Sequence, residues 1–300
     1  MINFKSISLS DKNWMDEVFH NLDLRSAEYC FASTFLWGGS CDMQIANVDG
    51  CFTGRRVCHG DVLYNWPVGK EEVGNIVYEM AEIAKKEGYG LKFYGPKALI
   101  EPGVEKYFSG KYTLREERQW FDYVYLAEKM ASLQGKKLHG KRNHINKFIA
   151  ENENWSVELI TDENLGEVRE MCNNWFIQSE AERDIDFSIE KGILNRVFDN
   201  YKILGFEGAA LRSNGRVIGF TMGEKLCKDT FITHFEKAYS DVQGAYPMIN
   251  REFSKIIMSR NPEIVYINRE DDLGLENLRK AKLSYYPEML VEKCTAIITL

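Results

Sequence analysis

The alternation of apolar and polar residues is clearest in Thr230–Ile249, which predicts a strand, a turn and a helix. Successive residues of the strand, Thr230–Lys237, point to opposite faces, so His234 and Glu236 are expected side by side on one face. Gly244 permits a tight turn, and a helix with apolar residues at helical spacing then runs to about Met258. The N–H groups at a helix start suit an anion, but the same pattern also fits an ordinary βα unit.

The same periodicities divide the rest of the chain into two halves with a similar order of elements. In the first half, strands are predicted at 4–9, 43–48, 51–57, 61–65, 91–94 and 120–126, and helices at 11–20, 26–37, 71–86 and 101–108. In the second half, strands are predicted at 156–160, 202–212, 216–225, 230–237, 264–267 and 289–298, and helices at 164–176, 245–258 and 275–281. This matched order predicts two copies of one α/β architecture, at 1–127 and 128–300.

Composition indicates a globular chain with an acidic surface. Of its 300 residues, 44% are hydrophobic and 13% aromatic, which is enough for a large core. The net charge of −7 argues against broad nucleic-acid binding and leaves room only for a local basic patch.

The cysteines and the hydropathy pattern indicate a cytoplasmic protein. The number of cysteines, seven, is odd, and no C-x-x-C motif occurs, so reduced and mostly buried thiols are expected. The five histidines are not spaced as zinc ligands are, so no metal site is expected. No signal peptide and no apolar run of membrane-spanning length is present in the sequence, so no integral membrane segment is expected. Neither G-x-S-x-G, Walker A nor G-x-G-x-x-G occurs, which sets aside the hydrolase, P-loop and dinucleotide-binding classes.

The basic residues concentrate in one predicted helix, 136–150, at the start of the second half. Lys137, Lys141 and Lys147 fall on one face beside His144, while Arg142 falls near the apolar stripe. One interpretation is a strip that binds the phosphates of a nucleotide or of an RNA acceptor end. The other is a solvated helix face that links two domains, which is what most charge runs are.

His234 and Glu236 are the acid–base candidates. Transfer of an acyl group to an amine needs a group that accepts the proton and donors that stabilise the oxyanion. A strand carboxylate or imidazole just before a helix start fits the first need. The alternative is a buried, hydrogen-bonded histidine and a salt-bridged glutamate.

A second polar cluster follows the predicted strand 264–267, at the edge where open α/β sheets bind ligands. The cluster begins with Asn268, Arg269 and Glu270. Arg279 or Lys282 is expected to hold a phosphate or carboxylate, and Tyr285 or Tyr286 to donate a proton to a leaving group. The alternative is a helix capped by Asp272 and followed by a Tyr-Pro turn.

Three segments carry a resemblance to a known family: GKKLHGKRNHINKF (135–148), HFEKAYSDVQGAYPMIN (234–250) and YINREDDLGLENLRKAKLSYYP (266–287). Together they resemble the C-terminal catalytic domain of bacterial phosphatidylglycerol lysyltransferases, and most of all its stand-alone relatives, called DUF2156. The resemblance covers nearly the whole chain, and the third segment is its most specific part. It implies two tandem folds of the GNAT N-acetyltransferase type, similar also to the peptidoglycan-bridge aminoacyltransferases.

The resemblance also implies an activity, which is transfer of an aminoacyl group from aminoacyl-tRNA to a lipid or another acceptor. In GNAT enzymes a Q/R-x-x-G-x-G/A turn before the central helix holds the pyrophosphate of coenzyme A. Here Gln243, Gly244 and Ala245 give one glycine at a different spacing, which argues against ordinary acetyl-CoA binding.

The first hypothesis is therefore an aminoacyl-tRNA-dependent acyltransferase without a resident cofactor. In it Lys137, Lys141, Arg142 and Lys147 hold the tRNA acceptor end, and Glu236 or His234 handles the proton. Asn268, Arg269 and Glu270 position the amine or hydroxyl of the acceptor, which is an unidentified small molecule, peptide or lipid. The second is an N-acetyltransferase that binds acyl-CoA at Gln243–Pro247. The third is a non-catalytic binding protein on the same fold.

Overall fold

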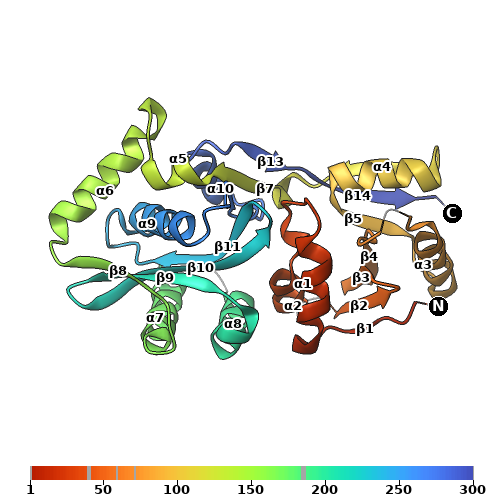
Figure 1. Ribbon diagram of the computed structural model, residues 1–300, viewed down its shortest axis with the longest axis horizontal. Coiled ribbons are helices and arrows are strands. Elements are labelled where there is room, and N and C mark those ends of the chain that lie inside the picture. The colour runs from red at the N-terminus through yellow and green to blue at the C-terminus, as the bar shows by residue number, and fades with distance from the viewer. Residues whose placement is uncertain (1, 39–41, 59, 71, 184–186, 300) are drawn as a thin grey trace. The chain divides into compact units, whose positions relative to one another are not determined.

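The chain divides into two compact units, each described by itself. The computed structural model describes residues 2–38, 42–58, 60–70, 72–183 and 187–299. Unit 1 comprises residues 1–123, 270–279 and 290–300, and unit 2 comprises residues 124–269 and 280–289. Each unit is built around one seven-stranded sheet, and the ribbon in Figure 1 shows the course of the chain through both.

The sheet of unit 1 is mixed, because β4 and β5 are parallel and the other pairs of neighbouring strands are antiparallel. Its strands, in spatial order, are β1 (Lys5–Ser6), β2 (Asp42–Val48), β3 (Cys51–Cys58), β4 (Asp61–Asn65), β5 (Lys92–Pro96), β14 (Lys293–Ile298) and β6 (Tyr112–Glu116). The helices before residue 124 are α1 (Lys12–His20), α2 (Phe31–Trp37), α3 (Gly74–Glu87) and α4 (Lys97–Phe108), with short 3-10 turns at Leu9–Asp11, Ala27–Tyr29 and Arg118–Trp120.

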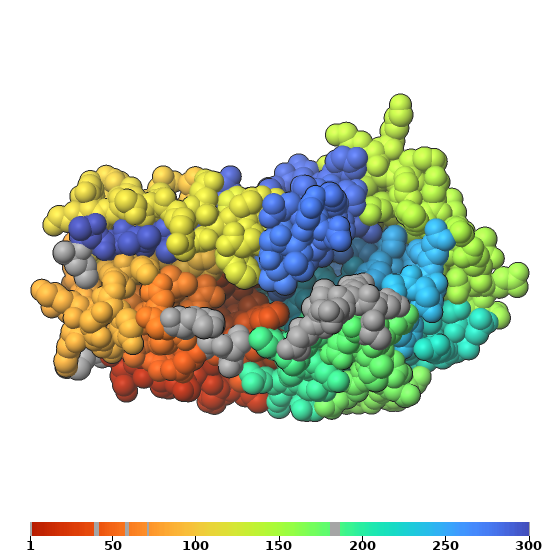
Figure 2. Space-filling model, turned by 180° about the vertical axis from the view of Figure 1, so that it is seen from behind, coloured from red at the N-terminus to blue at the C-terminus, as the bar shows by residue number. Residues whose placement is uncertain are grey.

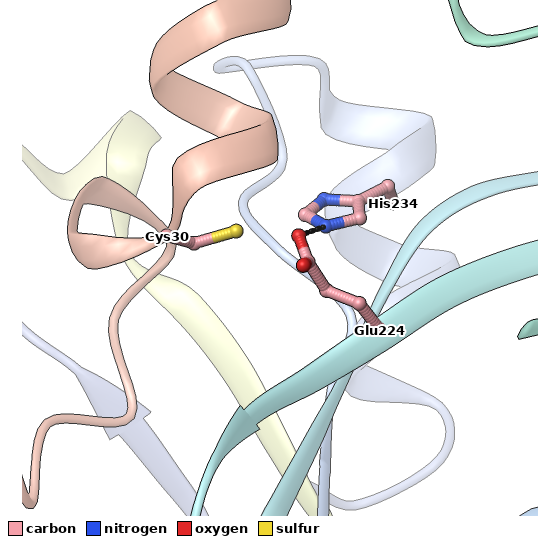
Figure 3. A group of neighbouring side chains, drawn as sticks. All are labelled: Cys30, Glu224 and His234. Atoms are coloured by element: carbon pink, nitrogen blue, oxygen red, sulfur yellow. Dashed lines mark hydrogen bonds and ion pairs between the residues drawn. The ribbon is translucent and has the colours of Figure 1, made fainter. Parts of the chain in front are cut away.

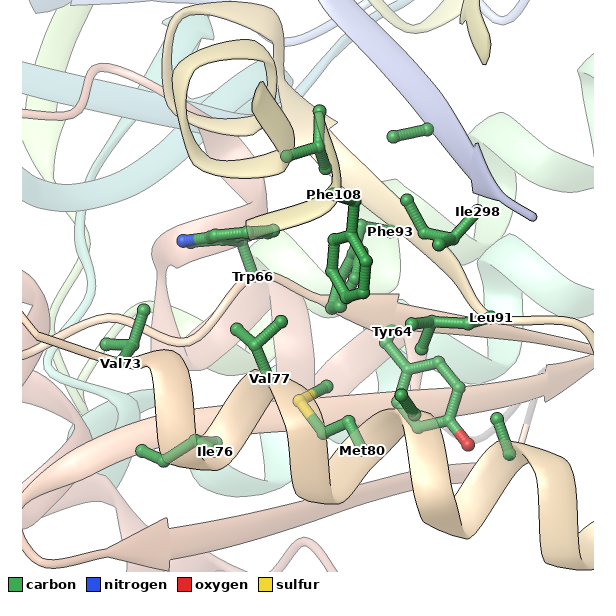
Figure 4. Packing of buried hydrophobic residues seen from close by; sticks show 14 of the residues in the cluster. Tyr64, Trp66, Val73, Ile76, Val77, Met80, Leu91, Phe93, Phe108 and Ile298 are labelled. Carbon is green, nitrogen blue, oxygen red and sulfur yellow. The ribbon is translucent and has the colours of Figure 1, made fainter. Parts of the chain in front are cut away.

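One hydrophobic cluster fixes α3 and α4 on the same face of this sheet. Val77 and Met80 of α3 and Phe108 of α4 pack with Tyr64 of β4 and Phe93 of β5, all of them buried (Figure 4). Apolar residues at helical spacing on α3 produce this contact, as the sequence predicts.

The last strand of the chain belongs to unit 1. Strand β14 is hydrogen-bonded between β5 and β6, and Thr295 pairs with Tyr94 on one side and with Arg115 on the other. Its predecessor β13 (Met289–Val291) lies in the sheet of unit 2 beside β7 (Asp122–Leu126). The single strand predicted at 289–298 is therefore two strands in two sheets, and the linear division at residue 127 differs from the division into compact units.

The sheet of unit 2 is also mixed, with β11 and β12 parallel. Its strands, in spatial order, are β13, β7, β12 (Tyr266–Asn268), β11 (Thr230–Ala238), β10 (Arg216–Cys227), β9 (Glu207–Ser213) and β8 (Trp155–Leu159). The remaining helices are α5 (Ala127–Ser132), α6 (His139–Glu151), α7 (Leu165–Arg183), α8 (Ser188–Leu204), α9 (Ala245–Arg260) and α10 (Glu276–Leu283), with a 3-10 turn at Lys136–Leu138.

Helices cover both faces of the unit 2 sheet. The ribbon shows α9 on one face and α7 with α8 on the other (Figure 1). Phe231 of β11 packs edge-on against Phe253 of α9, whereas Lys237 of the same strand bonds Glu190 of α8 and lies over the ring of Trp175 in α7. These contacts distinguish the α9 face of the sheet from the face of α7 and α8.

Helix α8, Ser188–Leu204, was not predicted from the sequence, and its end overlaps the strand predicted at 202–212. The helix continues to Leu204 and ends at Gly205, whose φ of 73° closes it with a left-handed cap, so β9 begins only at Glu207. Buried Ile193, Val197 and Tyr201 stand at helical spacing, and that spacing would have predicted the helix.

The predicted class, a mixed α/β fold, is confirmed by two mixed sheets with helices packed on them. Tandem GNAT-like domains stay a prediction. Five cysteines are free and buried, at positions 30, 51, 172, 227 and 294. Cys41 and the side chain of Cys58 lie outside the described residues, as does Glu71 of the predicted helix 71–86. No described helix has the combined length and apolar character that crossing a bilayer requires.

Candidate functional site

A β-bulge in β11 separates the two acid–base candidates. Met222 of β10 pairs with Phe235, but the next residue, Gly223, pairs with Thr233, so His234 is an extra residue in β11. Each side chain before the bulge is shifted to the other face relative to a regular strand. The expectation that His234 and Glu236 share a face is therefore wrong.

His234 lies on the face of α7 and α8. Its Nε2 is 3.1 Å from Oε1 of Glu224 in β10. Glu224 pairs with Ile232, so its side chain lies on the face of Ile232, which is opposite to the face of Phe231 and α9. The imidazole also stacks on the ring of Phe206, with centroids 5.2 Å apart, and only 2% of its side chain is exposed. The close-up shows the imidazole against the Glu224 carboxylate (Figure 3). This is the buried, hydrogen-bonded histidine of the alternative interpretation.

Glu236 lies on the face of α9 and is held at both carboxylate oxygens. Oε1 accepts a hydrogen bond from Nη2 of Arg269 at 2.8 Å, and Oε2 accepts one from Nδ2 of Asn250 at 2.9 Å. Arg269 directly follows β12, and Asn250 is on α9, so three elements of unit 2 fix this carboxylate. Charge-assisted bonds at both oxygens fix its orientation.

Each partner of Glu236 has a further polar atom that is buried and unpaired. Nη1 of Arg269 and Oδ1 of Asn250 have no hydrogen-bond partner among the described residues. The amide orientation of Asn250 is settled chemically, because an ionised carboxylate only accepts hydrogen bonds and must face the NH₂ group. Buried polar atoms without partners are rare and costly. A donor and an acceptor on either side of one carboxylate are thus suited to a polar ligand.

Aromatic rings and a lysine hold Arg269 from the other side. Its guanidinium carbon lies 5.1 Å from the ring centroid of Tyr285 and 5.8 Å from that of Tyr125 on β7. Nζ of Lys282 donates a hydrogen bond to the carbonyl oxygen of Arg269 at 2.6 Å. The hydroxyl of Tyr125 donates one to the backbone carbonyl oxygen of Lys282 at 2.9 Å. Cation–π contacts and a tied backbone leave the guanidinium little freedom.

Lys141 of α6 completes this group, which we call the Glu236 cluster: Glu236, Asn250, Arg269, Tyr285 and Lys141. Its Nζ lies 4.1 Å from the ring centroid of Tyr285. Desolvation and the Arg269 charge lower the pKa of Lys141 to about 8, against a smaller opposite effect of Glu236. With Lys141 protonated, the cluster carries two positive charges and one negative charge, so it favours an anionic or strongly polar ligand.

Tyr285 stays protonated at neutral pH. Burial raises the pKa of its phenol well above the ordinary value; the Arg269 charge opposes this effect and the Glu236 charge adds to it. The predicted role of Tyr285 as a donor is thus compatible with its surroundings, since a neutral phenol donates a hydrogen bond.

The turn before α9 is covered by α6. Gly244 has a φ of 84°, and a methyl group there would lie 2.3 Å from the carbonyl oxygen of His144 and 2.9 Å from Cβ of Phe148. Gln243 is exposed beside it. Both Gly244 and α6 belong to unit 2, and α6 packs directly on the turn at which the N-acetyltransferase hypothesis places acyl-CoA.

The other basic residues of the predicted strip differ in their surroundings. Nη1 of Arg142 donates to the carbonyl oxygens of Leu133 and Gly135, so this side chain holds the turn that leads into α6. Lys147 makes an exposed ion pair with Glu151 at 3.6 Å. Nζ of Lys137 lies 5.1 Å from the ring centroid of Tyr286. The helix that carries Lys141 and Lys147 forms part of the molecular surface, where it is yellow-green in Figure 2.

Three further predicted site residues are not part of the Glu236 cluster. Arg279 of unit 1 makes two bonds to Asp272, at 2.8 and 2.9 Å, so its guanidinium is paired within its own segment. Glu270 of unit 1 adopts a left-handed φ of 55°. Asn268 is fully buried within β12, where it pairs with Ile232 and Val124.

Sequence reasoning missed Asn250 and Tyr125. Asn250 stands next to Ile249 on the buried side of α9 and is itself buried, so its signal was a polar residue on an apolar helix face. Tyr125 belongs to a strand predicted at the end of the first half, and nothing local indicates that this strand pairs with β12.

Comparison with known proteins identifies relatives along nearly the whole chain. A family model described as phosphatidylglycerol lysyltransferase, C-terminal, matches residues 19–297. A conserved protein of unknown function from Bacteroides thetaiotaomicron has a similar structure, with 32% identity, 99% of this chain and 100% of that chain covered, and a TM-score of 0.93.

More distant relatives agree with that match. The C-terminal domain (DUF2156) of a putative lysylphosphatidylglycerol synthetase from Agrobacterium fabrum shares the fold at 13% identity, with coverage of 97% and 92% and a TM-score of 0.68. An uncharacterized protein of Mycoplasmoides gallisepticum is 24% identical over 175 residues, which are 57% of this chain and 54% of that protein. The chain thus spans about half the length of that curated relative.

Proposed function

This chain belongs to the family of phosphatidylglycerol lysyltransferase C-terminal domains, and from that premise we propose that it is an aminoacyltransferase. In this proposal the Glu236 cluster of unit 2 binds an aminoacyl ester of tRNA, and the aminoacyl group passes to an amine or hydroxyl acceptor. The acceptor is a small molecule, a peptide or a lipid.

The observation that carries the proposal is the pair of buried, unpaired atoms beside Glu236. An aminoacyl ester presents an α-ammonium group and a carbonyl oxygen only a few ångströms apart. The ammonium group needs acceptors, which the Glu236 carboxylate and Oδ1 of Asn250 supply. The carbonyl oxygen needs a donor, which Nη1 of Arg269 supplies. A plain acyl group has no ammonium and would leave the acceptor side unsatisfied.

The same residues suit the chemistry of transfer. The acceptor nitrogen or oxygen forms a bond to the ester carbonyl carbon, the bond from that carbon to the ribose oxygen breaks, and the proton lost by the acceptor ends on the ribose oxygen. Nη1 of Arg269 stabilises the negative charge that develops on the carbonyl oxygen. The amine of Lys141, with its pKa lowered to about 8, exchanges the proton near neutral pH.

The contact between α6 and the Gly244 turn supports a donor other than acyl-CoA. The His144 carbonyl oxygen and Cβ of Phe148 in α6 pack directly against Gly244 of that turn. The N-acetyltransferase hypothesis thus lacks a supporting observation in unit 2.

A binding measurement tests recognition of the aminoacyl group. We expect the protein to bind charged tRNA more tightly than the same tRNA after deacylation or after N-acetylation of the α-amine. Glu236→Gln should remove the preference for the free amine, about tenfold or more in Kd, because a hydrogen bond to a charged group contributes about 1.5–3 kcal/mol. Glu151→Gln, an exposed carboxylate of α6, is the matched control and should keep the preference.

A turnover measurement then tests transfer. With radiolabelled aminoacyl-tRNA and a cell extract freed of tRNA, the label should move into a lipid, peptide or small-molecule fraction, and Arg269→Lys should slow this movement. Equal affinity for charged and deacylated tRNA, or no movement of label above the rate in buffer, would overturn the proposal. If charged tRNA binds with the expected preference but no label moves, the result would favour a non-catalytic binding protein.

A further inference from the structure

Two consecutive tyrosines after α10 face two lysines that are four residues apart. Nζ of Lys141 lies 4.1 Å from the ring centroid of Tyr285, and Nζ of Lys137 lies 5.1 Å from that of Tyr286. All four residues belong to unit 2. The two tyrosines differ in exposure, at 7% for Tyr285 and 46% for Tyr286. The inner ring is thus part of the Glu236 cluster, whereas the outer ring presents a surface to solvent.

The backbone at Tyr286 is held in a sparsely populated conformation. Its φ is 54°, in the left-handed region that bulky residues rarely adopt. Such a conformation costs about 1–3 kcal/mol and is found most often at functional sites. The N–H of Tyr286 donates to the carbonyl oxygen of Leu283 at 2.9 Å, which anchors the turn to the end of α10. An exposed aromatic side chain gains little from burial to offset this strain.

We propose that Tyr286 and Lys137 form a stacking platform for a nucleobase at the single-stranded 3′ end of tRNA. The proposal rests on the proposed function and names the part of the substrate that this surface holds. A ring paired with an ammonium group is the combination that single-stranded nucleic acids bind, with the base stacked on the ring and the cation near the phosphate.

The platform is next to the Glu236 cluster along the chain. The 3′-terminal ribose carries the aminoacyl ester, so its base lies one nucleoside away from the reacting carbonyl carbon. Tyr286 is adjacent in sequence to Tyr285, whose ring is 5.1 Å from the Arg269 guanidinium. Stacking ignores base identity because every base has a π face. That suits an end that all tRNAs share.

The test compares intact tRNA, both charged and deacylated, with tRNA that lacks the terminal adenosine and therefore carries no aminoacyl ester, on wild-type protein and on variants. Tyr286→Ala should weaken binding of intact charged tRNA by about 5- to 150-fold, the range that corresponds to the loss of one base–aromatic stack. Tyr286→Phe keeps the ring and should bind as the wild type does. Tyr78→Ala, which removes an exposed tyrosine of unit 1, is the matched control and should have no effect.

The shortened tRNA separates stacking from a general loss of affinity. Wild type and Tyr286→Ala should bind it equally, because the stacked base is missing. Lys137→Met should reduce the slope of log affinity against log salt by about one. Thermal unfolding of each variant provides the folding check.

The outcomes distinguish this inference from the proposed function. If the wild type prefers charged tRNA but Tyr286→Ala binds it equally well, the platform is wrong and the proposed function stands. If Tyr286→Ala loses affinity equally for intact and shortened tRNA, the stacking assignment is also wrong. If Tyr286→Ala instead weakens binding to phosphatidylglycerol vesicles alone, the ring belongs to a lipid site. No tRNA binding by the wild type overturns both proposals.

Discussion

Lys293 is held by charge rather than by apolar contacts. Its ammonium group is fully buried in unit 1, 2.7 Å from Oδ1 of Asp122 and 2.7 Å from Oε1 of Glu28. Burial of a charge is costly unless it is paired, and here two carboxylates share one ammonium group. The three side chains therefore depend on one another.

Replacement of this lysine should be strongly destabilising. Lys293→Met leaves two buried carboxylates without their cation and should lower the free energy of unfolding by about 3–5 kcal/mol, measured by urea denaturation. Lys106→Met, which removes an exposed ion pair with Glu72, should leave the urea midpoint unchanged. Equal midpoints for the two variants would contradict the assignment of this energy to burial.

Lys141 should titrate well below an ordinary lysine. Its pKa of about 8 is lowered by desolvation and by Arg269, so competitive acetylation followed by peptide mass spectrometry should give half-maximal reactivity near pH 8. Arg269→Met removes the neighbouring charge and should raise this pKa. Glu236→Gln removes the anion that raises the pKa and should lower it further. A shift in the same direction for both variants would rule out the direct electrostatic cause.

Because an anionic ligand prefers the ammonium form, the affinity for deacylated tRNA, which has no α-amine of its own, should fall as pH rises through 8. The protonated fraction of Lys141 decreases there, while ordinary lysines remain charged. Filter binding at pH 7 and pH 9 at constant ionic strength measures this change. Lys141→Met should remove the pH dependence, while Lys147→Met should keep it.

At the scale of elements, glycines mark two close approaches in unit 2. A methyl group on Gly223 would lie 1.8 Å from the carbonyl oxygen of Ile232, at the bulge that moves His234 to the other face. Gly244 makes the corresponding approach to α6. A glycine inside a predicted strand is the sequence signal for such a bulge.

Two glycine substitutions should have opposite effects. Gly244→Ala places Cβ against the His144 carbonyl oxygen at a φ of 84° and should lower the midpoint of thermal unfolding. Gly140→Ala, in α6 with open space around it, should raise stability by about 0.4–1 kcal/mol. If Gly244→Ala were as stable as the wild type, α6 would not be packed on the turn as described.

Prediction from sequence succeeded where a local pattern was sufficient. The periods of β11, α9 and α3 gave their positions within a few residues. Glu236, Arg269, Lys141 and Tyr285, which were named from sequence, lie together in the structure, and their roles stay predictions. It failed where a distant partner decides the outcome. The bulge depends on β10, and the place of β14 depends on two strands about 200 residues earlier. Gly223 is a local signal for the bulge, but no local pattern carries the register of β10 on β11 or the position of β14.

At the scale of the whole molecule, the chain passes between its two units four times, after residues 123, 269, 279 and 289. Unit 1 therefore includes two segments from the end of the chain, residues 270–279 and 290–300, in addition to residues 1–123. Without β14, both β5 and β6 would lose a hydrogen-bonded neighbour.

A fragment that ends at residue 127 should not fold cooperatively, since its sheet lacks β14. The same fragment joined through a Gly/Ser linker to residues 270–300 regains both missing segments of unit 1 and should show a sigmoidal thermal transition by circular dichroism. Cooperative unfolding of the short fragment would show that β14 is dispensable and would favour the linear boundary.

Because β14 is the last strand of the chain, the sheet of unit 1 is completed only at the end of synthesis on the ribosome. About 200 residues are translated between β5 and β14. At about 5–20 residues per second this takes roughly 10–40 seconds. For most of that time the residues of β5 and β6 are outside the exit tunnel without the strand that pairs with both of them. The nascent chain is then most exposed to wrong pairing with neighbouring chains, and a chaperone that covers these strand residues would protect the newly made protein.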